Sequence, residues 1–203
     1  MKIPNQKKIW DKIAQEWHDF RDKPSEHTLK FLKKQSGDVL DLGSGSGRYL
    51  TKIKNEKMHL VDFSEKMIEL AEKKAKSKKI SAEFFVSDMI KLPFKDNFFN
   101  GAIANSSIHC IEGKVNRKKT VKELYRVLKP GAQAEISVWN KNSKRFKNSP
   151  KERFVRWRDK GKRYYYLFEP EEIYKLFENI GFKIIEKEVP QRMIIFIVEK
   201  PKD

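Results

Sequence analysis

The sequence predicts an α/β fold with a mainly parallel sheet that helices cover on both faces. Three observations predict it. From residue 37 onward, short apolar runs alternate with segments of helical periodicity. The first run enters a glycine-rich turn, and the last two runs, at residues 182–189 and 193–199, flank Pro190 as an antiparallel pair would. At 203 residues with 38% apolar content, the chain suits a single domain, 1–203.

Residues 1–36 are predicted to form a helical N-terminal extension. Trp10 and Trp17 mark one apolar face of a first helix. Pro24 interrupts the helical pattern because proline lacks a backbone N–H donor, and a second helix is expected to end near Gly37.

The core, residues 37–139, is predicted to hold five strands and the helices between them. The strands are expected at residues 38–42, 57–61, 82–86, 98–104 and 133–139. Helices are expected at residues 48–55, after the N-cap residue Ser64, and at residues 115–128. Pro130-Gly131 is expected to separate the last helix from the fifth strand. Residues 164–203 would then add a helix at 170–179 and the terminal hairpin.

Residues 140–163 stand apart as a basic insertion. They contain eleven lysines and arginines, against only Glu152 and Asp159. Aromatic residues such as Phe154 and Trp157 are interspersed, whereas a pure linker would carry fewer of them. The segment is expected to project beside the carboxyl ends of the strands, where it either docks a phosphate backbone or forms a flexible solvated tether.

The charge and the apolar content limit the classes of partner. A net charge of +17 favours a polyanionic partner, with nucleic acid ahead of membrane, and the alternative is lysine-rich solvation. The longest apolar run, residues 193–198, is far too short for a membrane span, and no apolar leader follows Met1. One cysteine excludes an internal disulfide framework and a cysteine-based zinc cluster. We therefore expect a cytoplasmic protein without a metal or membrane partner.

Acidic residues and a glycine loop follow the predicted strands. The glycines of residues 43–47 let backbone N–H groups approach a ligand closely. Asp62 ends the second strand, where a carboxylate can accept both ribose hydroxyls, and Asp88 follows the third, where it can accept from an adenine amino group. Because the carboxyl ends of parallel strands share one edge, these groups and Asp41 are expected to form a single site.

In these motifs the chain resembles the class I S-adenosylmethionine-dependent methyltransferases, over roughly residues 37–200. The resemblance implies a Rossmann-like, seven-stranded sheet with a terminal antiparallel hairpin, S-adenosylmethionine as cofactor and S-adenosylhomocysteine as product. It also implies a set of cofactor-binding residues. They are Asp41, Gly43, Ser44, Gly45, Gly47, Asp62, Phe63, Asp88, Met89 and Asn105. The alternative is a nucleotide-binding or inactive relative.

Three further features resemble the tRNA wobble-uridine methyltransferases that esterify 5-carboxymethyluridine. They are the stretch from Trp10 through Trp17 and Phe20 to Arg21-Asp22-Lys23-Pro24, Ile108-His109 after the fourth strand, and residues 162–168, which contain Arg163-Tyr164-Tyr165, after the insertion. The sequence departs from that family's pattern at Ser25, Asn100 and Cys110, and these departures bear on the exact substrate more than on methyl transfer.

The chemistry of such a reaction is simple to state. A carboxylate with a pKa of about 4 is ionised at neutral pH, so its methylation needs positioning rather than a strong base. Arg21 is expected to anchor the carboxylate and His109 to orient the uridine; the alternatives are a solvated cation and a structural histidine. Residues expected to bind tRNA are Lys23, Arg145, Arg153, Arg156, Arg163, Tyr164 and Tyr165. For the tyrosines, packing within a strand is an equal alternative, and Cys110 is expected to pack.

The resemblance also implies a partner, a small zinc-binding activator protein that adds a strand at the edge strand 81–86. Any zinc would belong to that partner. Two other functions stay open: a small-molecule methyltransferase acting on a carboxylic acid or a quinone, and a non-catalytic scaffold that binds RNA or the cofactor.

Overall fold

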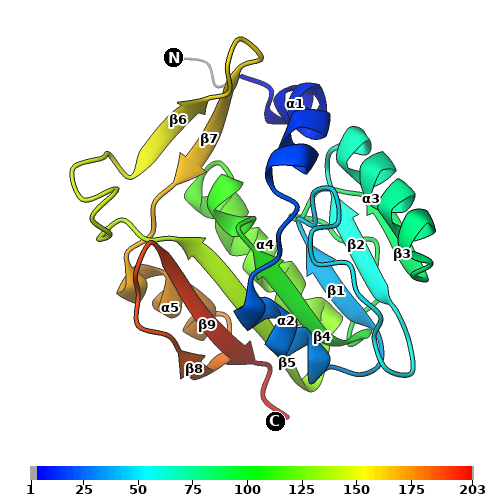
Figure 1. Cartoon of the computed structure of the whole chain (residues 1–203). Coiled ribbons are helices and arrows are strands. Elements are labelled where there is room, and N and C mark those ends of the chain that lie inside the picture. The colour runs from blue at the N-terminus through cyan, green and yellow to red at the C-terminus, as the bar shows by residue number, and fades with distance from the viewer. Residues whose placement is uncertain (1–3, 203) are drawn as a thin grey trace.

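The computed structural model describes residues 4–202 and contains a seven-stranded sheet with helices on both faces (Figure 1). The strand order is β3 (Ala82–Val86), β2 (Met58–Asp62), β1 (Val39–Leu42), β4 (Phe99–Asn105), β5 (Leu128–Trp139), β9 (Met193–Glu199) and β8 (Lys183–Lys187). The first five strands are parallel, and β9 runs antiparallel to both of its neighbours. The predicted seven-stranded, mainly parallel sheet with a terminal hairpin is confirmed.

Two apolar layers hold the helices against the sheet. The helices α4 (Lys114–Val127) and α5 (Pro170–Glu178) pack on one face, where Leu40 and Leu42 are fully buried. The helices α2 (Glu26–Lys33) and α3 (Glu65–Lys78) pack on the other face, over Val39. The side chains of successive residues in β1 therefore pack on opposite faces of the sheet, as a parallel sheet covered on both sides requires.

The N-terminal helix α1 (Gln6–Phe20) lies across the carboxyl ends of the central strands, beside α3. The Asp11 carboxylate accepts a hydrogen bond of 2.6 Å from the Oγ of Ser64, the N-cap residue of α3. The Ser64 Oγ in turn accepts from the backbone N–H of Met67 at 3.2 Å, so the predicted cap is confirmed. One polar chain thus fixes α1 over the end of β2.

The predicted helix at residues 48–55 is wrong. The glycine loop runs into turns, in which the N–H of Leu50 bonds the carbonyl of Gly47, and the segment then pairs as a bridge between Ser36 and Lys54. Gly43, Gly45 and Gly47 all have positive φ, which keeps a right-handed helix from starting. Tyr49, Leu50 and Ile53 are nevertheless buried.

The expected break at Pro130-Gly131 is also wrong, because β5 continues through both residues. The register between β4 and β5 shifts here, and proline is tolerated at such a bulge. The Gly131 N–H donates to the carbonyl of Lys200 at 2.7 Å. A residue that follows β9 thus supplies a hydrogen bond to β5 at the place where the pairing of β5 with β4 is interrupted.

The basic insertion contains a strand that the sequence did not predict. The strands β6 (Glu152–Arg156) and β7 (Lys162–Tyr166) form a separate antiparallel hairpin beside α1 (Figure 1). The Tyr164 N–H donates to the Gln6 side chain of α1 at 2.8 Å, and the Trp157 indole N–H donates to Glu16 at 2.7 Å. Among residues 4–202, no helix is long and apolar enough to cross a membrane.

Candidate active site

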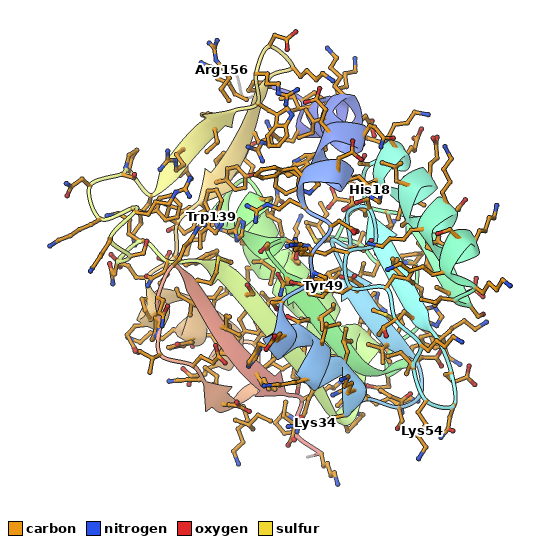
Figure 2. All side chains as sticks on the ribbon, viewed as in Figure 1. His18, Lys34, Tyr49, Lys54, Trp139 and Arg156 are labelled. Atoms are coloured by element: carbon orange, nitrogen blue, oxygen red, sulfur yellow. The ribbon has the colours of Figure 1, made fainter. Side chains whose placement is uncertain are left out.

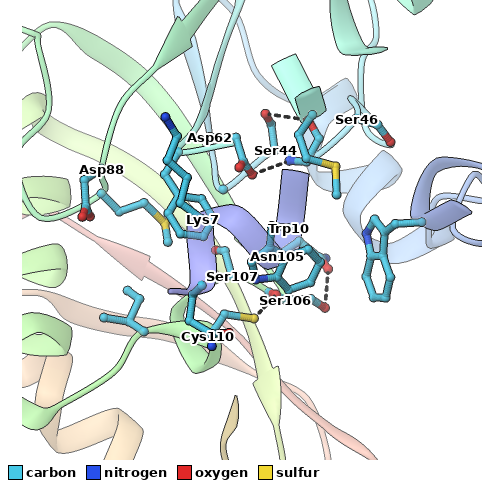
Figure 3. A pocket seen from close by; sticks show the side chains of 18 of the residues that line it. Lys7, Trp10, Ser44, Ser46, Asp62, Asp88, Asn105, Ser106, Ser107 and Cys110 are labelled. Atoms are coloured by element: carbon cyan, nitrogen blue, oxygen red, sulfur yellow. Dashed lines mark hydrogen bonds between the residues drawn. The ribbon is translucent and has the colours of Figure 1, made fainter. Parts of the chain in front are cut away.

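A cavity of about 380 Å³, here the first cavity, lies at the carboxyl ends of β1, β2 and β4 beneath α1. Figure 3 shows Asp62, Asp88 and Asn105 around it, with Trp10 from α1. The predicted residues that line it are Asp41, Gly43, Ser44, Gly45, Asp62, Phe63, Asp88, Met89 and Asn105. Gly47 is not among them; it faces Ala71 of α3, which a Cβ at Gly47 would meet at 3.2 Å.

Asp62 organises the glycine loop. Its two carboxylate oxygens accept hydrogen bonds of 2.9 Å each, one from the N–H of Gly45 and one from the N–H of Ser64. Burial raises the pKa of Asp62 to about 6, although those two backbone bonds oppose the shift. An ionised carboxylate held in this way keeps lone pairs for a ligand hydroxyl.

Asp41 contributes a second buried carboxylate. Within residues 4–202, its Oδ2 is buried without any hydrogen-bond partner. Burial raises the pKa of Asp41 to about 7, while the nearby Arg48 opposes the shift and Asp62 adds to it. A buried polar atom that has no protein partner indicates a place for a ligand's donor or positive charge.

Gly43 brings the loop backbone against the first cavity. Its φ is +76°, and a Cβ there would come within 2.4 Å of the Ser107 Cβ. A side chain would therefore push the loop away from β4 and fill the space where backbone N–H groups approach a ligand. Both the positive φ of residue 43 and its close approach to Ser107 therefore require glycine at this position.

Asn105 is fixed from behind by a buried polar chain. Its side-chain N–H donates to the Thr28 hydroxyl at 2.9 Å, which donates to the Glu135 carboxylate at 2.5 Å. Glu135 is fully buried in β5, where burial raises its pKa, and it also faces the His27 ring at 2.8 Å. The chain links α2 to the end of β4 and so sets the orientation of Asn105.

A smaller cavity of about 200 Å³, here the second cavity, adjoins the first. It lies where the end of α1, the end of β5 and the start of β9 meet. Arg21, Arg48 and Trp17 line both cavities, while Arg192 and His109 line only the second. The Arg21 guanidinium lies over the rings of Trp17 and Phe20, at 5.5 Å and 5.2 Å from their centroids. Burial lowers the pKa of Arg21, and repulsion by Arg48 and Arg192 adds to this shift.

His109 is buried and neutral. Its ring stacks on Trp139, with 5.1 Å between the centroids, and its Nδ1 accepts the backbone N–H of Trp139 at 3.2 Å. The proton therefore lies on Nε2, and burial lowers the pKa of His109 to about 3. His109 can donate a hydrogen bond into the second cavity but is not a cationic acid at neutral pH.

The residues expected to bind tRNA divide into two groups. Lys23, Arg145 and Arg156 are exposed, and Arg156 lies at the outer end of the hairpin, far from Trp139 (Figure 2). Arg153 is half-buried and donates to the Ser149 hydroxyl at 2.9 Å.

The Arg-Tyr-Tyr segment is buried instead. Tyr164 is fully buried and its hydroxyl accepts from Arg117, so the structure favours the packing alternative for it. Tyr165 is also buried; it stacks on Trp139 and lines the second cavity. The Arg163 guanidinium lies 4.7 Å from the Trp157 ring centroid and donates to the Tyr165 hydroxyl, so it has no exposed face for RNA.

Several cavity residues were missed by sequence reasoning. Arg48 directly follows the glycine loop, a position that could have been noticed. Trp10 and Trp17 were assigned to an apolar helix face and to a motif shared with the tRNA methyltransferases, but not to a site, and nothing in the local sequence marks Arg192. Burial raises the pKa of Cys110 to about 12, which keeps this thiol protonated and fits the packing role expected of it.

Comparisons with known proteins add a family. Residues 39–131 match a family described as a methyltransferase domain. The chain is 29% identical to the tRNA (carboxymethyluridine(34)-5-O)-methyltransferase of Schizosaccharomyces pombe over 88% of each chain. It is 31% identical to the Arabidopsis thaliana protein of the same name, over 65% of this chain and 32% of that one. The chain spans about a third of the length of the first mammalian relatives that it matches.

Solved structures share the fold. A Pyrococcus horikoshii protein is 26% identical, with a TM-score of 0.71 over 94% of this chain and 93% of that one. The methyltransferase solved in complex with the Haloferax volcanii Trm112 methyltransferase activator is 18% identical, with a TM-score of 0.72 over 98% of this chain and 100% of that one. The second likeness is one of fold alone.

Proposed function

We propose that this chain, which belongs to the class I S-adenosylmethionine-dependent methyltransferases, esterifies the carboxylate of 5-carboxymethyluridine at the wobble position of tRNA. Its cofactor is S-adenosylmethionine. The observation that carries the proposal is that the second cavity, which directly adjoins the cofactor side, is lined by three arginines and, within residues 4–202, by no aspartate or glutamate.

The first cavity fits the cofactor. Asp62 would accept the ribose hydroxyls, Asp88 and Met89 would contact the adenine, and the unpartnered Asp41 oxygen would face a donor or positive charge of the ligand. The loop at Gly43 leaves room for close approach of the backbone. When bound there, S-adenosylmethionine supplies an electrophilic methyl group.

The acceptor chemistry follows from the lining of the second cavity. Within residues 4–202, no aspartate or glutamate lines it; His109 has a pKa of about 3 and Cys110 a pKa of about 12. None of these groups would take a proton from an acceptor at neutral pH. This lining favours an acceptor that is already a nucleophile, and a carboxylate with a pKa of about 4 is one. Arg21 would hold it through charge-assisted hydrogen bonds, and the His109 Nε2–H would donate to the base.

The relatives' names and the surface charge support tRNA as the carrier of that carboxylate. Both the fission yeast and the Arabidopsis relative are named for carboxymethyluridine 34. The exposed Lys23, Arg145 and Arg156 would meet phosphates, which give affinity without sequence information. The alternative acceptor, a small carboxylic acid, would not need these cations, and activity on it would be insensitive to salt.

An activator protein is part of the proposal. The strand β3 lies at the edge of the sheet, Phe84 and Phe85 are only partly buried, and Val86 is 48% exposed. Such an edge offers backbone groups for an added strand. The Haloferax neighbour was solved with its activator, which supports a similar partner here. We place the reaction in the cytoplasm, and any zinc in the partner.

The test supplies labelled methyl donor to tRNA that carries 5-carboxymethyluridine, with and without the activator. The control tRNA carries the carbamoylmethyl amide at the same position. We expect label only in the carboxylate-bearing tRNA, and mild alkali should release it because an ester hydrolyses readily. No label in the presence of the activator, or label that resists alkali, would refute the proposed reaction.

A further inference from the structure

The two adjoining cavities differ in charge. The first is lined by acids and cations together: Asp41, Asp62, Asp88 and Glu112 with Lys7, Arg21 and Arg48. In the described part of the chain, no acid lines the second, where three arginines converge from distant segments. They are Arg21 after α1, Arg48 after the glycine loop, and Arg192 in the turn between β8 and β9. The second cavity is therefore built for an anion.

Within residues 4–202, these arginines have no carboxylate partners. Across residues 4–202, the arginine ion pairs closer than 4.0 Å belong to Arg126 and Arg158. The Nε of Arg21 is buried without a hydrogen-bond partner. Cations that line one cavity without a carboxylate beside them repel one another, and a bound anion would relieve that repulsion and give the buried Arg21 Nε an acceptor.

The three arginines lie at two depths. Arg21 and Arg48 line both cavities and so lie at their boundary, next to the site of methyl transfer. Arg192 lines only the second cavity and is exposed, so it lies at the mouth. The Arg192 carbonyl accepts the backbone N–H of Asn140 at 3.1 Å, which fixes its turn to the end of β5.

The size of the cavity decides what each arginine meets. At about 200 Å³ it is smaller than the roughly 300–1,000 Å³ of pockets that enclose a drug-sized ligand. It therefore suits one substituted base rather than a whole nucleotide. A base whose carboxylate reaches the inner end leaves its sugar and phosphates at the mouth, beside Arg192.

We propose, on the basis of the function proposed above, that the second cavity is a two-anion pocket. Arg21 and Arg48 bind the carboxylate that is methylated, and Arg192 binds a phosphate of the same nucleotide. The pocket then selects a nucleotide over a free carboxylic acid, because only the nucleotide supplies both anions.

The experiment measures binding of three probes to the protein loaded with S-adenosylhomocysteine, by calorimetry. The probes are 5-carboxymethyluridine 3′,5′-bisphosphate, its nucleoside without phosphates, and the bisphosphate with a carbamoyl group in place of the carboxylate. R192A should weaken binding of the carboxylate bisphosphate at least about tenfold and leave the nucleoside unchanged. R48A should weaken both carboxylate probes similarly and leave the carbamoyl bisphosphate unchanged.

Two controls keep the result specific. K183A removes an exposed cation from β8, lines neither cavity, and should change no probe. R192K keeps the charge and should recover most of the bisphosphate affinity, which a merely structural role for the arginine would not predict. Melting temperatures establish that each variant is folded.

The inference is overturned if R192A affects nucleoside and bisphosphate equally or not at all, or if R48A weakens the carbamoyl probe as much as the carboxylate probes. It is also overturned if the wild type binds the bisphosphate no more tightly than the nucleoside. The tRNA assay separates the two proposals. If esterification fails but the probes bind in the expected pattern, the proposed reaction alone is refuted. If esterification succeeds but the probe pattern is not seen, the two-anion pocket alone is refuted.

Discussion

Asp62→Asn should separate cofactor affinity from protein stability. The side chain keeps its shape but loses its charge and one of two acceptor oxygens. The carboxylate now accepts from the N–H groups of Gly45 and Ser64, each at 2.9 Å. With asparagine, one of these N–H groups faces an amide donor instead of an acceptor.

The expected size of each effect follows from these contacts. A lost hydrogen bond to a charged group costs about 1.5–3 kcal/mol. Against this, burial raises the pKa of Asp62 from 3.8 to about 6 even though those two bonds oppose the shift, so the charged form is disfavoured in the folded protein by about 3 kcal/mol, a penalty that the neutral amide avoids. Protein stability should therefore change little. The cofactor has no such offset, and losing two charge-assisted bonds to its ribose lowers its affinity at least about 100-fold.

The assay pairs calorimetry of S-adenosylhomocysteine binding with a thermal melt and a tRNA filter-binding measurement. Asp96→Asn is the matched control, because Asp96 pairs with Arg126 and lines neither cavity. We expect a melting temperature near that of the wild type, retained tRNA binding and a large loss of cofactor affinity. A cofactor affinity within about threefold of the wild type would sink the assignment of Asp62 to the ribose.

Three further changes test other parts of the structure. Burial raises the pKa of Asp41 to about 7, so cofactor affinity should rise from pH 6 to pH 8 as Asp41 ionises. The Asp41→Asn variant should lose the part of this rise that Asp41 causes. A wild-type cofactor affinity that does not change with pH would contradict this. Gly43→Ala should lower the melting temperature and abolish cofactor binding, because the new Cβ would lie 2.4 Å from the Ser107 Cβ. Gly113→Ala, at a position with positive φ but nothing within 4 Å, should only lower the melting temperature. Equal cofactor binding by both variants would refute the role of the Gly43 loop in binding the cofactor. Reversing the charge of Arg145 or Arg156 should weaken tRNA binding and reduce its salt slope by about 1 each, and an unchanged slope argues against phosphate contacts there.

Local patterns predicted most of the sheet and its helices. The cap at Ser64 and the strand at residues 82–86 were predicted at their observed places, because their signals lie within a few residues of the element itself. The helix predicted at residues 48–55 is absent because the segment forms turns after three glycines with positive φ, and these turns bury Tyr49 and Ile53 without a helix. Buried apolar residues next to a glycine loop therefore do not by themselves indicate a helix.

The hairpin β6–β7 could not be foreseen from composition. Its strand β6 alternates exposed and half-buried positions, but charged residues occupy both kinds, as at Arg153 and Arg156. Its half-buried Val155 packs on a cluster that contains Trp139 and Tyr165, and Trp157, which follows the strand, donates to Glu16 of α1. A tertiary partner more than a hundred residues away leaves no periodic signal in the strand itself.

The two cavities were unequally predictable. Asp62 and Asp88 were placed together correctly, because the carboxyl ends of parallel strands share an edge once the order of strands is known. Arg192 approaches Arg21 only because β9 lies next to β5 and the end of α1 reaches the same edge. Such a site depends on the path of the whole chain rather than on a motif.

The arginines of the second cavity also bear on the release of product. Esterification turns a carboxylate into a neutral ester, which accepts hydrogen bonds more weakly than the charged group does. Arg21 and Arg48 then lose that counter-ion and repel each other, the same repulsion that adds to burial in lowering the pKa of Arg21. Methylated tRNA should therefore bind more weakly than carboxymethyl tRNA, and the difference should shrink in the Arg48→Ala variant. Equal affinity of the wild type for both tRNAs would mean that the carboxylate is not what these arginines hold.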